Sequence, residues 1–256
     1  MYDENVSLPT IRFAVGAGHG GASMLEGARA FATALGETLQ QKVQLVVADD
    51  YEQLLTKVLG GGAELAWMPP LLHAKATLAG ATLAVVSERD GAVTYRSALL
   101  VAVGSPAKTL ADLHDVRVAW SDPKSAAGHI FPREHLVAAG VTFAAETFAG
   151  SPLAACAAVA DGEADVCACF VREAAATVPA RALADVSRVY APATWRLRVL
   201  SITDAIPPDG IVLAPTISPA DAARYVRGLR RMHEKPAGLT ALWSLMSATR
   251  LVKPPR

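Results

Sequence analysis

The sequence has no excess of charge of either sign. Its 256 residues include 24 Lys and Arg and 24 Asp and Glu, so the charges balance. Proteins that bind nucleic acids or anionic membranes through a basic surface carry a clear excess of Lys and Arg. The balance therefore argues against nucleic acid as a partner and against a polybasic membrane clamp.

Long apolar runs are also missing. The sequence holds no run of about 18 apolar residues, the length that a membrane-spanning helix needs, so we expect no membrane insertion. The segment from Met1 to Pro9 is acidic and polar and lacks a basic-then-apolar leader. Two compartments stay open: the cytoplasm if Met1 is the native start, and the periplasm or cell envelope if a leader was removed.

Cysteine is scarce and odd in number. Cys167 and Cys169 alternate in an apolar segment, so they would share one face of a strand, and Cys156 precedes them. No His or further Cys stands near them at the spacing of a zinc site. We expect buried free thiols and no metal site.

Motifs of known catalytic sites are missing as well. The sequence contains no Gly-x-Ser-x-Gly, no His-Glu-x-x-His and no paired Cys/His pattern. The glycine-rich segment 16–21 is neither a Walker loop, since no Gly-Lys-Ser/Thr follows, nor a full dinucleotide fingerprint. We therefore assign no catalytic residue and no cofactor.

What the sequence does have is the pattern of an α/β fold. It is 52% hydrophobic and 19% charged, and short apolar runs alternate with segments of helical periodicity. The predicted strands are 11–15, 43–47, 63–68, 81–87, 97–103, 116–120, 142–148, 164–170 and 198–203. The predicted helices are 24–39, 51–59, 71–79, 109–113, 152–160, 219–232 and 239–246, with a further helical pattern after residue 129.

One corner of this pattern predicts a binding site. The apolar run Val116 to Trp120 ends in small polar residues and glycine, and an amphipathic pattern follows. A strand that ends this way and leads into a helix leaves free backbone N–H groups and the positive helix end at one point. That point is suited to an anion or a polar ligand head. The alternative is an ordinary turn in which serine caps the helix.

Two extended segments, 95–103 and 196–203, are predicted to cross between lobes. Lobe 1 would then comprise residues 1–97 and 202–256, and lobe 2 residues 98–201. This discontinuous layout implies a cleft between the lobes and hinge closure over a ligand.

At this point the sequence resembles the substrate-binding proteins of phosphate, phosphite and phosphonate ABC transporters, which belong to the type 2 periplasmic-binding-protein superfamily. The resemblance runs from Ile11 to about Leu251 and rests on the order of several segments. They are Asp50-Tyr51-Glu52-Gln53-Leu54-Leu55, residues 62–70, 94–101 and 109–113, Asp122-Pro123-Lys124-Ser125-Ala126-Ala127-Gly128, Gly150-Ser151-Pro152, and residues 159–166 and 198–207. It implies a two-lobed fold in which each lobe is a mixed sheet flanked by helices, with two crossover hinge strands.

The sequence departs from the family at the corner itself. Family members that hold a phosphonate offer a Ser-Thr-Ser cluster of hydroxyls at this helix start, whereas here Ser125 is followed by Ala126 and Ala127. The family also tends to have His where Pro152 stands. A buried dianion that loses such donors loses several kcal/mol of hydrogen bonding, so a less charged, neutral or more apolar ligand stays open.

In lobe 1 the resemblance points to Tyr51, Gly20 and Gly21 as ligand contacts, and the end of a predicted strand adds Trp67. Tyr51 matches a family position that touches the ligand, and its alternative role is an aromatic staple at a helix start. Trp67 ends a strand at the expected cleft edge, and its alternative role is in the core. Gly20 and Gly21 would supply backbone donors.

Tyr95, at the predicted crossing, would cover the ligand from lobe 1, and in lobe 2 we expect ligand contacts from Ser121, Ser125, Ala126, Ala127 and His129. Tyr95 is also a common residue of ordinary strands. Ser121 and Ser125 either donate to the ligand or cap the helix. His129 would donate to an anion when charged, although a helix N-terminus lowers the pKa of such a ring.

Together these observations predict a solute-binding protein that closes on a small anionic or polar molecule. Its partners would be that ligand and an ABC permease, and the protein would be a monomer. Two alternatives stay open on the same fold: a cytoplasmic enzyme of lyase or dehydratase type, with His129 or His19 as the acid or base, and a ligand-sensing domain.

Overall fold

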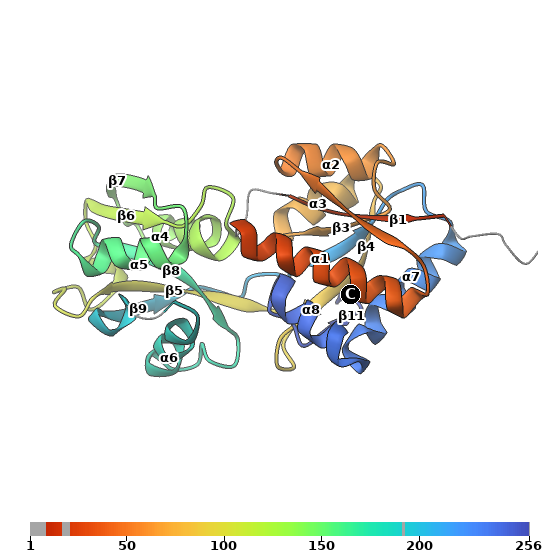
Figure 1. The fold of residues 1–256 in the computed structure, drawn as a ribbon. Helices are drawn as coiled ribbons and strands as arrows, with labels where there is room; N and C mark the ends of the chain where they lie inside the picture. The colour runs from red at the N-terminus through yellow and green to blue at the C-terminus, as the bar shows by residue number, and fades with distance from the viewer. Residues whose placement is uncertain (1–8, 17–20, 191–192, 256) are drawn as a thin grey trace, which may run out of the picture. The chain divides into compact units, whose positions relative to one another are not determined.

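The computed structural model describes residues 9–16, 21–190 and 193–255 (Figure 1). These residues form two compact units. Unit 1 contains the residues up to Val93 and those from Pro208 onward, and unit 2 runs from Thr94 to Pro207. Each unit has a mixed sheet with helices on both faces, so the predicted α/β class is confirmed.

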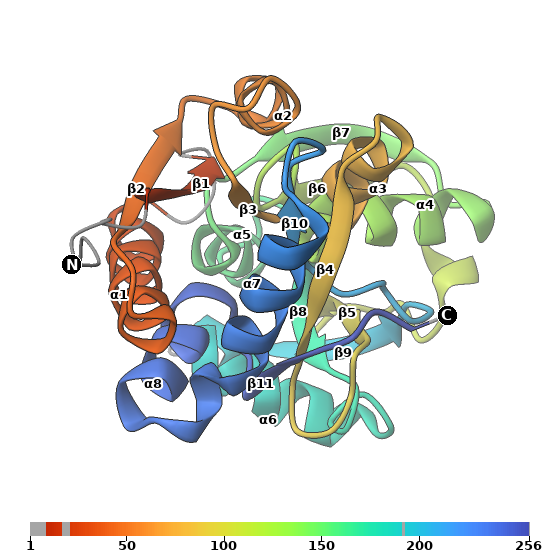
Figure 2. The same cartoon turned by 90° about the vertical axis from the view of Figure 1, so that its right-hand side faces the viewer.

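The sheet of unit 1 has the order β11-β4-β10-β3-β1-β2, and Figure 2 shows β2, β1, β3, β10 and β4 side by side. Its strands are β1 (Ile11–Gly16), β2 (Val43–Ala48), β3 (Leu65–Met68), β4 (Thr82–Glu88), β10 (Gly210–Leu213) and β11 (Arg250–Val252). The first three are parallel to one another, and β10 is antiparallel to both of its neighbours.

Helices cover both faces of the unit 1 sheet. They are α1 (Gly21–Leu39), α2 (Tyr51–Leu59), α3 (Pro70–Leu78), α7 (Pro219–Arg231) and α8 (Pro236–Met246), with a short 3-10 turn η4 (Met232–Glu234). In Figure 1, α2 and α3 lie on one face, and α1 and α8 on the other.

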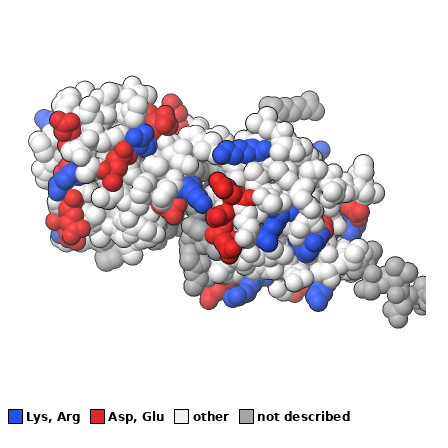
Figure 3. Space-filling view, turned by 90° about the horizontal axis from the view of Figure 1, so that it is seen from above, with Lys and Arg blue, Asp and Glu red and all other residues white. Residues whose placement is uncertain are grey.

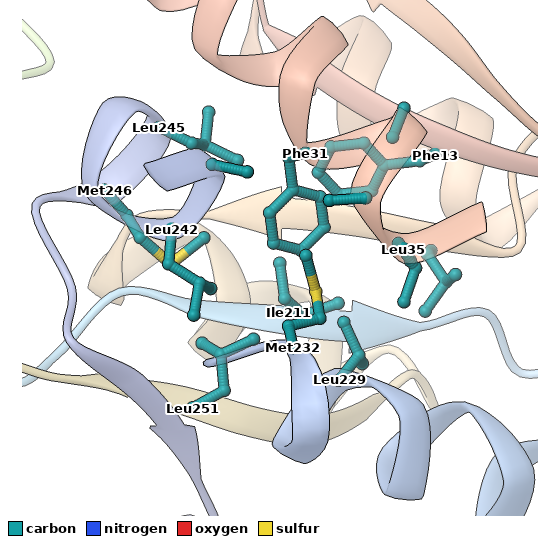
Figure 4. Packing of buried hydrophobic residues seen from close by; sticks show 14 of the residues in the cluster. Phe13, Phe31, Leu35, Ile211, Leu229, Met232, Leu242, Leu245, Met246 and Leu251 are labelled. Carbon is teal, nitrogen blue, oxygen red and sulfur yellow. The ribbon is translucent and has the colours of Figure 1, made fainter. Parts of the chain in front are cut away.

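The period-2 alternation of the strands decides which face each side chain joins. Phe13 in β1 packs with α1, α7 and α8, while its neighbour Ala14 packs with α2 and α3. Figure 4 shows the first of these cores, in which the rings of Phe13 and Phe31 meet at a centroid distance of 4.7 Å. Such aromatic and aliphatic burial is the main stabilising contribution to the unit.

A buried ion pair lies inside unit 1. Arg89 Nη2 is 2.5 Å from Asp209 Oδ1 and donates to the carbonyl oxygen of Met246, the last residue of α8, at 2.6 Å. The Ser87 hydroxyl donates to Asp209 Oδ1 and the Trp67 indole N–H donates to Asp209 Oδ2, each at 2.8 Å. The network joins β3, β4, the start of β10 and α8 around one carboxylate.

The sheet of unit 2 has the order β7-β6-β8-β5-β9. Its strands are β5 (Tyr95–Ala102), β6 (Val116–Trp120), β7 (Phe143–Phe148), β8 (Val166–Arg172) and β9 (Leu197–Ile202). Its helices are α4 (Phe131–Ala138), α5 (Pro152–Ala160) and α6 (Pro179–Tyr190), with shorter turns η1 (Leu110–Asp112), η2 (Ala126–Ile130) and η3 (Ala193–Arg196). Strands β6, β7 and β8 are parallel, and β5 is antiparallel to β8 and β9.

The two faces of the unit 2 sheet carry different helices. Leu136 of α4 packs with Trp120 and Ala168 on one face. Cys156 of α5 and Val186 of α6 pack with side chains of β8 and β5 on the other. Strands β5 and β9, which the sequence predicted to cross between lobes, are paired within this sheet, and the units divide at Val93/Thr94 and Pro207/Pro208.

The structure contains elements that the sequence did not reveal. β10 has four residues and β11 three, too few for a periodic signal, and both are held by pairing with strands distant in sequence. The helix α6 was also missed, although Ala182, Leu183 and Val186 pack against the core at helical spacing. α1 begins at Gly21, ahead of the predicted Met24.

The surface carries charges of both signs. On the face that Figure 3 presents, Lys and Arg side chains are interspersed with Asp and Glu side chains. Among the described helices, none is long and apolar enough to cross a membrane.

We predict that Asp209→Asn lowers the free energy of unfolding by about 3–5 kcal/mol at neutral pH, because it leaves the Arg89 charge buried without its counterion. Urea unfolding measures the difference. A matched control is Glu234→Gln, which breaks an exposed pair with Arg231 and should cost less than about 1 kcal/mol. Equal losses in the two variants would contradict the prediction.

The loss in Asp209→Asn should also depend on pH. Burial by itself would raise the pKa of Asp209, but the charge of Arg89 and the hydrogen bonds to the carboxylate outweigh it and lower the pKa below its ordinary value. A carboxylate with a lowered folded-state pKa stabilises the fold fully above its unfolded pKa of about 3.9 and loses that contribution as pH falls through the folded value. The gap between wild type and variant should therefore shrink below about pH 4.

Candidate functional site

The corner between β6 and α4 has the geometry that the sequence predicted. After Trp120 the chain turns, and the Ser121 N–H donates to the carbonyl oxygen of Gly128 at 3.1 Å. Ser125 has an extended backbone and caps the helix: its Oγ accepts from the Gly128 N–H at 3.0 Å. Ser125 therefore caps the helix, which is one of its two predicted roles.

The helix after Ser125 begins with a π turn, η2, which continues directly into α4. Ile130 N–H donates to the Ser125 carbonyl oxygen at 2.9 Å, five residues earlier. The first N–H groups of a helix have no acceptor inside it, so those of Ala126 and Ala127 lie at the positive helix end. Single π turns occur frequently at functional sites.

Close packing at Gly128 fixes this start. A β-carbon at this position would lie 1.8 Å from Ser121 Oγ, 2.9 Å from Ser121 Cβ and 2.8 Å from Ser125 Oγ. No side chain fits without displacing one of the serines. Two hydroxyls thus meet at the first turn because residue 128 is glycine.

Beneath the helix start, Ser97 in β5 is fully buried and donates to the Ala127 carbonyl oxygen at 2.6 Å. The Ala127 methyl group is buried with Tyr95 and Ile206, so this residue can offer a ligand its backbone rather than its side chain. The Tyr95 ring lies 5.2 Å from the ring of Phe170. The structure therefore brings Tyr95, Ala126 and Ala127 together in one cluster.

His129 is tied to its own corner. Its Nδ1 lies 2.8 Å from the Pro123 carbonyl oxygen, which can only accept, so Nδ1 carries a proton. The imidazole ring lies between Trp120, at a centroid distance of 5.3 Å, and Phe148, at 4.9 Å. These contacts give His129 a structural role in the turn, whatever its ligand contacts.

A carboxylate supports the same corner from β7. Trp120 Nε1 donates to Glu146 Oε2 at 2.8 Å, and Arg133 of α4 forms a salt bridge with Glu146 at 2.8 Å. The hydrogen bond from Arg133 lowers the pKa of Glu146 below its ordinary value, against the effect of burial and with help from Trp120. Glu146 is therefore ionised and holds α4 against the end of β6.

In unit 1 the candidate residues share one sheet edge. Because β1, β2 and β3 are parallel, their carboxyl ends meet at the same edge, where α1, α2 and α3 begin. Tyr51 is the first residue of α2, whose start is capped by Asp50, and a β-carbon on Gly16 would lie 3.1 Å from the Tyr51 ring. Gly21 begins α1, and Gly20 lies outside the described residues.

Trp67 is partly buried against the core formed by α1, α7 and α8, and its N–H is bound to Asp209. Trp67 therefore has its alternative predicted role as a core residue, and its indole N–H is occupied by Asp209. Ser97 and Phe170 were missed as neighbours of the corner. Ser97 did leave a signal, a polar residue inside the apolar strand 95–102.

No group of three or more His, Cys, Asp or Glu side chains within the described ranges is placed to hold a metal ion.

We predict that Gly128→Ala lowers the free energy of unfolding by about 1–3 kcal/mol, the usual range for overpacking. Chemical denaturation measures it. In a double-mutant cycle, Ser121→Gly should partly relieve the defect, with a coupling of about 0.5–3 kcal/mol, because it removes both Ser121 atoms that a β-carbon would meet. A coupling near zero would show that the close approach is not what constrains position 128.

Comparison with known proteins shows a family match over most of the chain. The family described as ABC transporter, phosphonate, periplasmic substrate-binding protein matches residues 17–254. That match spans both units.

Solved structures share the fold at low sequence identity. XAC2383 from Xanthomonas citri bound to chloride ion is 17% identical, with a TM-score of 0.79 over 96% of this chain and 92% of that one. PhnD1 from Prochlorococcus marinus in complex with methylphosphonate is 18% identical, with a TM-score of 0.74 over 95% and 92%. A binding protein component of an ABC phosphonate transporter from Pseudomonas aeruginosa is 16% identical, with a TM-score of 0.73 over 96% and 81%.

These likenesses confirm the predicted type 2 periplasmic-binding-protein fold. The predicted resemblance is confirmed as well, since the family match covers nearly the whole chain. The chain belongs to the family of periplasmic substrate-binding proteins of phosphonate ABC transporters.

Proposed function

We propose that this solute-binding protein holds the anionic end of a small, phosphonate-like molecule at the start of η2 in unit 2. The observation that carries the proposal is the helix start itself: the N–H groups of Ala126 and Ala127 have no acceptor within the helix, beside the hydroxyl of Ser125. Family membership supports a solute-binding role, and PhnD1 was solved in complex with methylphosphonate.

Backbone donors suit an anion. A hydrogen bond to a charged group contributes about 1.5–3 kcal/mol, and the positive end of the helix adds to it. Ser125 Oγ accepts from Gly128, which leaves its own proton free to donate to a ligand oxygen. The site would thus offer three donors from two adjacent backbone N–H groups and one hydroxyl.

The ligand would need fewer hydrogen bonds from side chains than a ligand held by the family's cluster of hydroxyls. Ala126 and Ala127 bring no hydroxyl, and the methyl of Ala127 is packed against Tyr95. We therefore propose an anion with few oxygens to satisfy, such as a phosphonate that carries an apolar substituent. Tyr51, Trp67, Gly20, Gly21, Ser121 and His129 stay predicted contacts.

Delivery of the ligand to an ABC permease from the periplasm completes the proposal, because the family consists of periplasmic proteins of such transporters. The proposal contains no catalytic step. The enzyme alternative rests on His129 or His19 as acid or base; His129 has its Nδ1 bound to Pro123, and His19 lies outside the described residues. The monomeric state and hinge closure stay predictions.

We predict that Ala126→Pro weakens methylphosphonate binding by about tenfold or more, because proline removes one N–H donor from the anion. Proline is tolerated at the first position of a helix, and the preceding Ser125 already has the extended backbone that proline requires, with ψ of 123°. Isothermal titration measures the affinity, and denaturation checks that the variant folds.

The matched control is Ala126→Gly, which keeps the N–H and should bind within about twofold of wild type. Inorganic phosphate, methanesulfonate and an uncharged alcohol serve as comparison ligands. A thermal shift with the anions and none with the alcohol is expected, since a ligand stabilises the state that it binds. A folded Ala126→Pro protein with wild-type affinity would refute this anion site.

A further inference from the structure

Three thiols meet inside unit 2, on the face of the sheet away from α4. Cys156 is in α5, and Cys167 and Cys169 are in β8, and all three are fully buried. Cys156 Sγ is 3.3 Å from Cys169 Sγ and 4.0 Å from Cys167 Sγ. The proposed binding corner uses none of them.

The topology explains why they meet. Residues two apart on a strand share a face, so Cys167 and Cys169 both point from β8 toward α5. Helix α5 crosses this face with Ala155, Cys156 and Val159 buried against it. Thiols separated by 11 and 13 residues in the sequence thus become neighbours in an apolar core.

We propose that Cys156 and Cys169 form a disulfide bond in the exported protein, while Cys167 stays a thiol. A disulfide needs its sulfurs about 2.05 Å apart, so the two side chains must close a gap of only about 1.2 Å between them. The pair of Cys156 and Cys167 would have to close a wider gap. The proposal extends beyond ligand binding and needs no ligand.

The bond forms by thiol–disulfide exchange. The Cys156 thiolate attacks one sulfur of a disulfide oxidant, which gives a mixed disulfide and releases one thiol. Cys169 then attacks Cys156 Sγ, so the protein disulfide forms and the second thiol leaves. The two thiol protons and two electrons of the protein pass to the oxidant, which is reduced to two thiols.

In the closed core the three thiols differ in acidity. Hydrogen bonds from Cys167 and Cys169 lower the pKa of Cys156 below its ordinary value, against the effect of burial. The pKa values of Cys167 and Cys169 are raised by their hydrogen bonds to Cys156 and by burial.

The compartment of the family favours oxidation. The periplasm is a compartment in which disulfides form and persist, and the family is periplasmic. Since all three thiols are buried in the folded unit, exchange must take place before this core closes. The finished bond would be shielded from reductants and would tie α5 to β8.

The experiment counts thiols. The chain is exported to the periplasm of a bacterial host, purified without reductant, unfolded in guanidinium with a maleimide, and weighed by mass spectrometry. We expect one maleimide adduct out of three cysteines, and a cross-linked pair of proteolytic peptides that carry Cys156 and Cys169. Protein that is unfolded, reduced and then refolded with the reductant still present should have a Tm lower by about 4–10 °C than the oxidised protein.

Cys167→Ala is the matched variant, and it should show no free thiol while keeping the same cross-link. Wild-type protein unfolded, reduced and refolded with oxidised and reduced glutathione gives a second, independent measurement with the same expected count. Three free thiols in both preparations, or a cross-link through Cys167, would overturn the proposal. Because no ligand enters these assays, their failure would leave the anion site unaffected.

Discussion

The close approach of Gly128 to two serines is the constraint on which the corner of unit 2 depends. With no side chain at 128, Ser121 and Ser125 pack against the first turn, and Ser125 can cap the Gly128 N–H. That cap ends the extended chain and starts the helix at Ala126. The direction of the first N–H groups, and with it the proposed anion site, follows from this contact.

Buried polar groups hold the framework around each candidate region. In unit 2, Ser97 binds the Ala127 carbonyl from below, so the helix start rests on the sheet through a hydrogen bond as well as through apolar contact. In unit 1, the Asp209 carboxylate accepts hydrogen bonds from Ser87 and Trp67 and forms an ion pair with Arg89. Burying a polar group costs little free energy only when the group is hydrogen-bonded. Both arrangements therefore depend on the particular partners that each group has.

Two of the predicted ligand contacts, Trp67 and His129, are bound to groups of the scaffold. The indole N–H of Trp67 is bound to a buried carboxylate, and the ring of His129 lies between Trp120 and Phe148 with Nδ1 bound to Pro123. Both residues support the scaffold. The donors of the proposed anion site are the backbone N–H groups of Ala126 and Ala127 and the hydroxyl of Ser125.

The sequence by itself determined the local pattern of this protein. Alternating apolar runs and helical periodicity predicted most strands and helices, because a strand or helix must bury its apolar face whatever it packs against. The change from Trp120 to small polar residues predicted the corner at Ser125. The family resemblance supplied the two-lobed fold.

Only the tertiary structure decided which distant residues meet. The Trp67 indole donates to Asp209, which is 142 residues away in the sequence. Ser97 donates to the Ala127 carbonyl oxygen, and Cys156 contacts Cys169. The short strands β10 and β11 form because the longer strand β4 pairs with both. Periodicity shows that a side chain is buried, but its partner depends on strand order and on which helix covers each face, and no local stretch of sequence contains that information.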